Sequence, residues 1–102
     1  MSVIEEPLLR KRSRLETYMD ILTALSSNKG VRVSHIMQRA NLSWLAMISC
    51  LEALEQHGLI EKLESQQRRK FWRITQNGSE VLRSFNETKV AVGLNEKIQE
   101  NV

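Results

Sequence analysis

Positively charged side chains gather in two short segments of the chain. No acidic residue occurs between Ser65 and Ile74, a stretch that carries Arg68, Arg69, Lys70 and Arg73. A second cluster near the amino terminus consists of Arg10, Lys11, Arg12 and Arg14. Arginine and lysine contact phosphate oxygens, and each phosphate that they neutralise adds a salt-dependent increment to affinity. The two clusters therefore predict contacts to a nucleic-acid backbone, the alternative for each being a solvated surface that binds nothing.

The other reactive residue types do not form a catalytic or metal site. Cys50 is the only cysteine and has no second thiol or base near it in the sequence, which favours a buried thiol over a redox sensor. With only His35 and His57 elsewhere, the ligands of a structural zinc site are missing. The chain also lacks a glycine-rich phosphate loop and a nucleophile with a spaced base. We therefore expect no enzyme, no metal and no cofactor.

The composition is that of an ordinary folded domain. The chain has 102 residues, a formal net charge of +3, 41% hydrophobic residues and 26% charged residues. These values exclude global disorder and suit one domain with one extension. No apolar run approaches the roughly 18 to 20 residues of a membrane span, and Glu5 and Glu6 stand where a secretion signal carries positive charge. We expect a soluble cytoplasmic protein associated with the nucleoid.

The first ordered element is predicted to be a helix. Ser13 with Glu16 three residues later is a capping-box pattern, and apolar residues then recur at helical spacing to about Ser27. A short strand is expected at 31–33, and Ser34 is expected to cap a second helix of about two turns.

A longer helix follows a tight turn. Ser43 is expected to cap this third helix, which should run to about His57, before Gly58. Its inward face is expected to consist of Met47, Leu51 and Leu54.

A β-hairpin is predicted after the third helix. Its two β-prone runs flank a polar stretch over 64–69. Because side chains alternate along a strand, Trp72 and Ile74 should face inward, leaving Phe71 and Arg73 outward. Phe71 is then either a stacking group for a nucleic acid or partner, or an ordinary exposed aromatic.

A long last helix is predicted over about 76–101. Thr75 is a typical N-cap, while Gly78 and Gly93 each cost about 1 kcal/mol relative to alanine within a helix. Such a helix is too long for the body to cover, so its apolar stripe is expected to pair with a second copy. The dimer contacts are expected to be Leu82, Phe85, Val92, Leu94 and Ile98. The alternative is a helix that docks on the first helix and frays after Glu87.

This order of elements is that of a winged helix-turn-helix, a three-helix DNA-binding unit with a β wing. A more specific resemblance rests on four stretches: KRSRLE at 11–16, SHIMQRANLSW at 34–44, LEALEQHGLIE at 51–61 and WRITQNGSEVL at 72–82. Together they resemble an archaeal family of small winged-helix proteins over residues 11 to about 86. The resemblance implies DNA-binding regulators or chromatin-type proteins that dimerise through a C-terminal antiparallel coiled coil.

The predicted fold class is mainly α with a small β-hairpin. We expect a flexible basic arm over 1–12, a winged helix-turn-helix domain over 13–75 and a coiled-coil dimerisation segment over 76–102.

The third helix is unusual for a recognition helix because it contains no Arg or Lys between 43 and 56. The outward face near its start is apolar. Either Trp44 packs against the second helix, or the face meets thymine methyl groups in the major groove, or it binds a protein. The candidate groove or phosphate contacts near the turn are Ser34, His35, Gln38, Arg39, Asn41, Ser43, Trp44, Leu45, Ile48 and Ser49.

The sequence thus predicts a transcriptional regulator that binds double-stranded DNA as a homodimer. The arm and wing would meet phosphates while the third helix enters the major groove. The rival hypothesis is a protein-interaction module whose apolar third-helix face contacts a transcription factor or polymerase subunit. Ile48→Glu, expected to leave the core intact, is the change that should separate the two.

Overall fold

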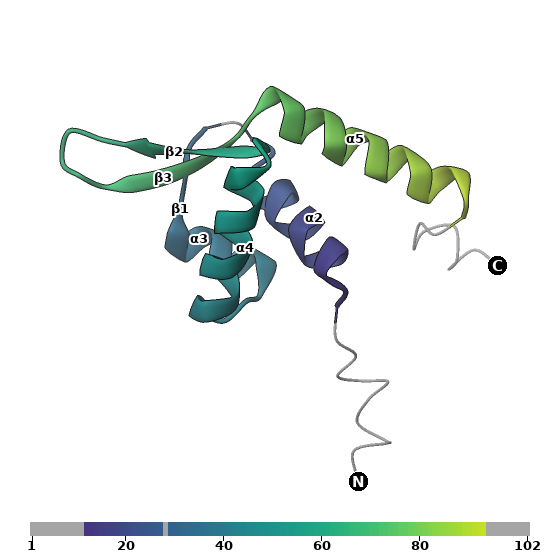
Figure 1. Cartoon of the computed structure of the whole chain (residues 1–102), viewed down its shortest axis with the longest axis horizontal. Helices are drawn as coiled ribbons and strands as arrows, with labels where there is room; N and C mark the ends of the chain where they lie inside the picture. The colour runs from purple at the N-terminus through teal and green to yellow at the C-terminus, as the bar shows by residue number, and fades with distance from the viewer. Residues whose placement is uncertain (1–11, 28, 94–102) are drawn as a thin grey trace, which may run out of the picture.

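The computed structural model describes residues 12–27 and 29–93 of the chain (Figure 1). The helices and strands are α2 (Arg14–Ala24), β1 (Val31–Arg32), α3 (Val33–Ala40), α4 (Trp44–Gln56), β2 (Ile60–Glu64), β3 (Lys70–Ile74) and α5 (Gln76–Ala91). The fold is mainly helical with a small antiparallel sheet, as predicted. None of the helices in the described residues is long and apolar enough to cross a membrane.

The cap residues of three helices behave as the sequence indicates. Ser13 and Glu16 form a reciprocal capping box at the start of α2, with N···O distances of 3.0 and 2.7 Å. The Ser43 hydroxyl accepts the amide of Ala46 in α4 at 3.3 Å, and Thr75 caps α5. The helix α2 ends at Ala24, earlier than expected.

The start of α3 differs from the prediction. Arg32 occupies the N-cap position without a side-chain cap, and Ser34 lies within the first turn instead of capping it. The reason is that β1 runs directly into α3 with no intervening turn. The helix then ends at Asn41, which has a left-handed φ of 55°, a conformation that asparagine tolerates better than most residues.

The sheet has three strands in the order β1-β3-β2, so β1 extends the predicted hairpin. Antiparallel register places Lys62 opposite Trp72, and the Lys62 Nζ lies 5.3 Å from the centre of the Trp72 ring. Trp72 and Ile74 face the core as predicted. Phe71 faces the other side of the sheet but is half-buried. It packs closely against Gly30, where an added Cβ would lie 3.3 Å from the Phe71 Cβ.

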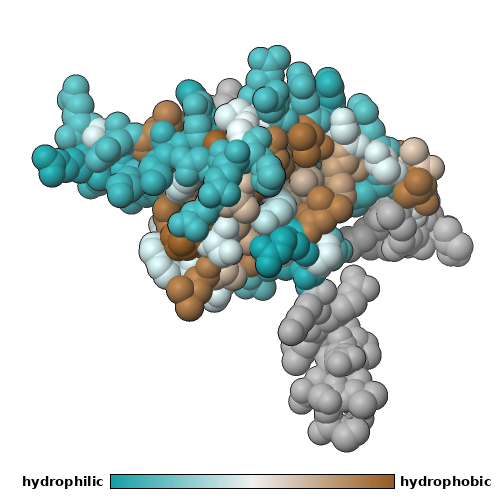
Figure 2. Space-filling model, viewed as in Figure 1, coloured by the Kyte–Doolittle hydropathy of each residue, from teal (hydrophilic) through white to brown (hydrophobic). Residues whose placement is uncertain are grey.

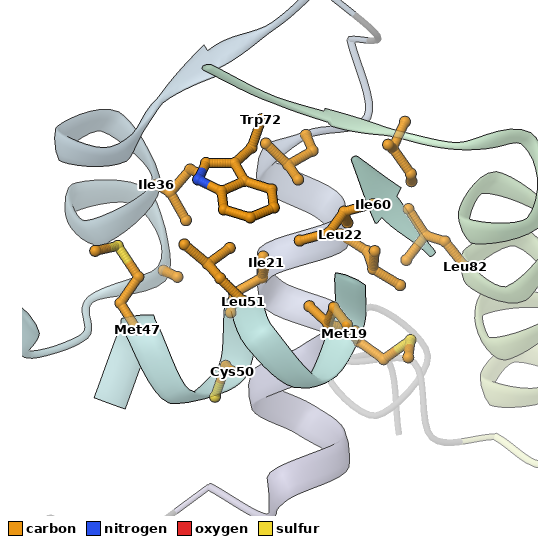
Figure 3. Packing of buried hydrophobic residues seen from close by; sticks show 14 residues of the cluster. Met19, Ile21, Leu22, Ile36, Met47, Cys50, Leu51, Ile60, Trp72 and Leu82 are labelled. Carbon is orange, nitrogen blue, oxygen red and sulfur yellow. The ribbon is translucent and has the colours of Figure 1, made fainter. Parts of the chain in front are cut away.

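One hydrophobic core joins the sheet to all of the helices. Figure 3 shows labelled members from α2, α3, α4, α5, β2 and β3 pointing toward one another. The inward residues predicted for the third helix, Met47, Leu51 and Leu54, are all buried. Gly78 permits close packing at the start of α5, since a Cβ there would lie 2.1 Å from the Leu59 carbonyl oxygen. This glycine therefore has a packing role beyond its propensity cost.

Two expectations about the last helix need correction. It ends at Ala91, and Gly93 follows the C-cap with a φ of 75°, the usual way in which glycine terminates a helix. One continuous helix through Gly93 is therefore wrong, and the part predicted over 94–102, with Leu94 and Ile98, lies outside the described residues. Leu82 and Phe85 were expected to contact a second copy, but both face the body of their own chain. Leu82 is buried in its core and Phe85 packs against that core.

Candidate nucleic-acid interface

The wing is a β-hairpin that projects from the helical body (Figure 1). Its turn is closed by hydrogen bonds from the Arg68 amide to the Ser65 carbonyl at 2.9 Å and from the Ser65 amide to the Arg69 carbonyl at 2.9 Å. Arg68, Arg69 and Lys70 are all exposed, and none forms an ion pair within the described residues. Figure 2 shows this tip as hydrophilic surface. The turn thus presents three adjacent cations to solvent.

The fourth predicted wing cation, Arg73, is engaged within the chain. Its Nε donates to Glu61 Oε2 at 2.9 Å, and its Nη2 also binds that oxygen. The two residues are direct partners across β2 and β3. This ion pair is not predicted from the sequence, because the acid comes from the facing strand and the stretch from Ser65 to Ile74 has none. Among the described residues, Arg68, Arg69 and Lys70 are therefore the cations of the wing tip without an ion pair.

The first helical turn of α4 presents an apolar surface. Trp44 is 55% exposed and Leu45 is 80% exposed, and Ser49 is exposed beside them. More than half of the Trp44 surface is therefore open to a groove or a partner, and the remainder is covered by the chain itself. Ile48 is different because it is half-buried and packs against the core. A glutamate at Ile48 would disturb the fold, so the expectation that it leaves the core intact is wrong.

Arg12 belongs to the folded body instead of a free arm. Its Nη1 contacts Asp20 Oδ2 at 2.6 Å and the Ala40 carbonyl oxygen at 2.7 Å, while its Nη2 donates to the Asn41 carbonyl at 2.9 Å. The last carbonyls of a helix have no partner within it. Arg12 therefore caps α3 and ties it to α2, so its charge is committed inside the chain. Arg10 and Lys11 lie outside the described residues.

The two flanks of α3 carry different polar groups. Successive residues are turned by about 100° around a helix, so Ser34 and Gln38 share one flank. The other flank carries Arg32, His35 and Arg39, and all of these polar residues are exposed. Together with Lys29, the second flank lines a cleft of about 330 Å³. Lys29 and Arg32 were missed as functional candidates, although basic groups recurring every three or four residues from 29 to 39 are a visible signal.

Comparison with known proteins identifies the architecture. Residues 11–92 match a family model described as winged helix-turn-helix. The chain belongs to this family. No curated protein matches the sequence.

Solved structures with the same fold include three that bear on the site. The transcriptional regulator BldR from Sulfolobus solfataricus is 23% identical with a TM-score of 0.70, and the match covers 82% of this chain and 60% of BldR. Sso10a-2, a DNA-binding protein from the same organism, is 19% identical with a TM-score of 0.65 over 89% of this chain and 97% of the other. A MepR–DNA complex from Staphylococcus aureus is 20% identical with a TM-score of 0.67, covering 86% and 79%. These likenesses establish the fold, and this chain spans less than two thirds of BldR.

Within the winged helix, the candidate residues divide into separate groups. The wing tip and the exposed start of α4 come from different elements, and the two flanks of α3 add two further groups. Arg14 lies on α2, where its Nη1 donates to the Tyr18 hydroxyl at 3.4 Å. Ser43 is occupied as the cap of α4, whereas Asn41 is exposed at the turn. The predicted contacts therefore come from the wing tip, the start of α4, the two flanks of α3 and α2.

Cys50 is buried in the winged helix, as its surroundings in the sequence suggest. Burial raises the pKa of the Cys50 thiol, and the positive charges of Arg14 and Arg12 partly oppose this effect. A thiol in this environment stays protonated and unreactive at neutral pH. Among the described residues, no group of three or more His, Cys, Asp or Glu side chains is placed to hold a metal ion.

Proposed function

We propose that this winged helix is a transcriptional regulator that binds duplex DNA. The observation that carries the proposal is the wing tip, where Arg68, Arg69 and Lys70 are exposed and free of ion pairs within the described residues. Three neighbouring cations on a projecting hairpin suit the regularly spaced phosphates of a duplex. The BldR and MepR structures, by their names, are of a transcriptional regulator and of a protein–DNA complex, which supports the proposal.

The start of α4 is proposed to enter the major groove. Trp44 and Leu45 would contact thymine methyl groups, and Ser49 would supply one hydroxyl. Ser34, Gln38 and Asn41 would contribute polar contacts near the turn. Since α4 carries no Arg or Lys for bidentate base contacts, affinity would come mainly from phosphates and sequence preference would be weak. Bound protein would act sterically, by blocking or recruiting the transcription machinery.

The protein is proposed to bind as a homodimer. Val92, at the C-cap of α5, is 59% exposed, and Leu15 of α2 is 52% exposed. Figure 1 shows α5 continuing beyond α2, away from the body. The resemblance to archaeal winged-helix proteins supports a dimerisation segment over 76–102. Within that segment, Leu82 and Phe85 pack in the core of their own chain. Two copies would place two wings on one duplex.

The test is fluorescence anisotropy of a labelled random duplex titrated with the full chain at several salt concentrations. Arg68→Ala with Arg69→Ala should weaken binding to every sequence. It should also reduce the slope of log affinity against log salt by about 1.8, because each phosphate contact contributes about 0.9. The control is Arg83→Ala, which removes an exposed cation from α5 and leaves the wing unchanged. Equal slopes for the two variants would contradict a role for the wing.

A second function is favoured by the exposure of Leu45. Leu45 is 80% exposed. A large apolar side chain with that exposure suits binding to a protein as well as it suits contact with the major groove of DNA. The alternative is a module that binds a transcription factor or polymerase subunit through the start of α4. Leu45→Glu separates the two functions, with Leu45→Gln as the uncharged control. A carboxylate in the groove should weaken DNA binding at least tenfold beyond the control, whereas equal DNA binding by both variants would favour the alternative.

A further inference from the structure

A basic cleft lies where the end of α2, β1 and α3 meet. Its volume is about 330 Å³, and one wall comes from the last turn of α2 and the loop that follows. The opposite wall is the second flank of α3, and Phe71 of β3 contributes from the sheet. The described residues that line it include Lys29, Arg32, His35 and Arg39, and none of the lining residues is acidic.

The cations of the cleft are free to bind a ligand. Within the described residues, Lys29, Arg32 and Arg39 form neither an ion pair nor a side-chain hydrogen bond. Arg12 and Arg73, in contrast, are held by acids of the same chain. Three uncompensated charges around a concavity repel one another, and an anion bound between them would relieve that repulsion. The cleft is therefore an electrostatically favourable place for an anion.

The number and kind of donors indicate which anion fits. A guanidinium presents a planar fork of N–H groups that matches the oxygens of one carboxylate or phosphate. Arg32 and Arg39 supply two such forks, and Lys29 supplies a third cation. Together they offer more positive charge and more hydrogen-bond donors than a carboxylate, with one negative charge and two oxygens, can pair with. A phosphate monoester carries nearly two charges and three strong acceptor oxygens. Phe71, half-buried at the side of the cleft, adds apolar surface for the remainder of an organic phosphate.

The start of α3 lies at the edge of the cleft, where Arg32 and His35 line it. Arg32 is the N-cap residue and makes no side-chain cap hydrogen bond, so the first turn lacks the usual acceptor. Free amides at a helix start carry partial positive charge and bind phosphate readily.

We propose that this cleft is a phosphate-binding site, distinct from the wing, that takes the phosphate group of a small organic phosphate. The inference goes beyond the proposed function because it concerns binding without DNA. A phosphate in the cleft could instead belong to the backbone of bound DNA, and the same variants separate these two sources.

The test follows amide signals of the ¹⁵N-labelled full chain by NMR during titration with inorganic phosphate, AMP or acetate at constant ionic strength. Phosphate and AMP should shift the signals of Gly30, Arg32 and His35, with acetate at least tenfold weaker. Arg32→Gln with Arg39→Gln should weaken phosphate and AMP binding at least tenfold. Because both arginines are exposed, the variant should melt within a few degrees of the unmodified chain.

The control is Arg83→Gln on α5, which removes an exposed cation that does not line the cleft and should bind phosphate like the unmodified chain. Phosphate shifts no larger than those from acetate, or equal weakening by the two variants, would overturn the proposal.

Anisotropy with a random duplex identifies the source of the phosphate. If the cleft and control variants bind DNA equally, the ligand is a free organic phosphate. If phosphate and AMP occupy the cleft and the cleft variant alone loses DNA affinity with a smaller salt slope, the site receives a backbone phosphate of DNA. The first result supports the proposed site for a small organic phosphate, and the second overturns it in favour of a contact to the DNA backbone.

Discussion

The guanidinium of Arg12 and the carboxylate of Asp20 meet with an Nη1···Oδ2 distance of 2.6 Å, and that same nitrogen lies 2.7 Å from the Ala40 carbonyl oxygen. One side chain at the start of the described chain thus joins α2 to the end of α3. The turn that follows Ala40 leads into α4, so the way in which α3 is held against α2 also affects where α4 lies.

Replacing Arg12 by glutamine should lower the free energy of unfolding by about 1 to 2 kcal/mol. The exposed ion pair with Asp20 contributes well under 1 kcal/mol after solvent screening, so most of the loss comes from the carbonyls of Ala40 and Asn41. Urea denaturation measures the change, and Arg14→Gln is the neighbouring control, which should leave the free energy of unfolding nearly unchanged. In a double-mutant cycle with Asp20→Asn, a coupling that accounts for the entire loss would contradict the capping role.

Gly78→Ala should destabilise the protein, although alanine is the better helix former by about 1 kcal/mol. The added Cβ would lie 2.1 Å from the Leu59 carbonyl oxygen, so the start of α5 and the backbone just before β2 would have to separate. We expect a loss of about 3 kcal/mol, measured by thermal or urea unfolding. Gly93→Ala is the control, since no atom of the described residues lies within 4 Å of its added Cβ and its φ of 75° opposes a side chain at about 1 kcal/mol. A stabilised Gly78→Ala protein would show that this close approach is not maintained.

The proposed dimer predicts different effects for two valines of the same helix. Val92→Glu should convert the dimer to a monomer, because Val92 continues the face of α5 that carries Leu82 and Phe85 beyond the body. Val90 is also more than half exposed, but it is turned by about 160° from Val92 around the helix axis, so Val90→Glu should remain dimeric. Sedimentation equilibrium of the full chain determines the state. Dissociation by Val90→Glu alone, or by neither variant, would place the interface elsewhere.

The buried thiol predicts a stability loss at high pH. Because the pKa of Cys50 in the folded protein is raised above its ordinary value of 9.0, the folded state holds the proton more tightly than the unfolded state. The resulting stability is fully present below pH 9 and is lost as the pH rises through the folded-state pKa. Unfolding free energies between pH 7 and 10 should therefore fall more steeply for the unmodified chain than for Cys50→Ala. Parallel curves would show that the thiol is not desolvated.

The sequence by itself determined the order of the elements and most of their ends. Ser13 with Glu16, Ser43, and Thr75 mark helix starts because a cap contacts an amide only three residues away, which makes its signal local. The inward placement of Leu51 and Trp72 follows from the periods of a helix and a strand. The family resemblance rests on the same local patterns and is confirmed at the level of the winged helix-turn-helix family.

Tertiary structure alone decided which charges are available. Arg73 faces Glu61 through the register of two strands, and Arg12 reaches Ala40 from 28 residues away. It also gathered Lys29 with the second flank of α3 into a cleft and turned Leu82 into the core. Such pairings depend on how the helices and strands pack, and a charge count along the chain contains no information about the facing residue. For that reason the wing tip has three cations without ion pairs in the described residues, while Leu45 of α4 is the most exposed large apolar side chain among those residues.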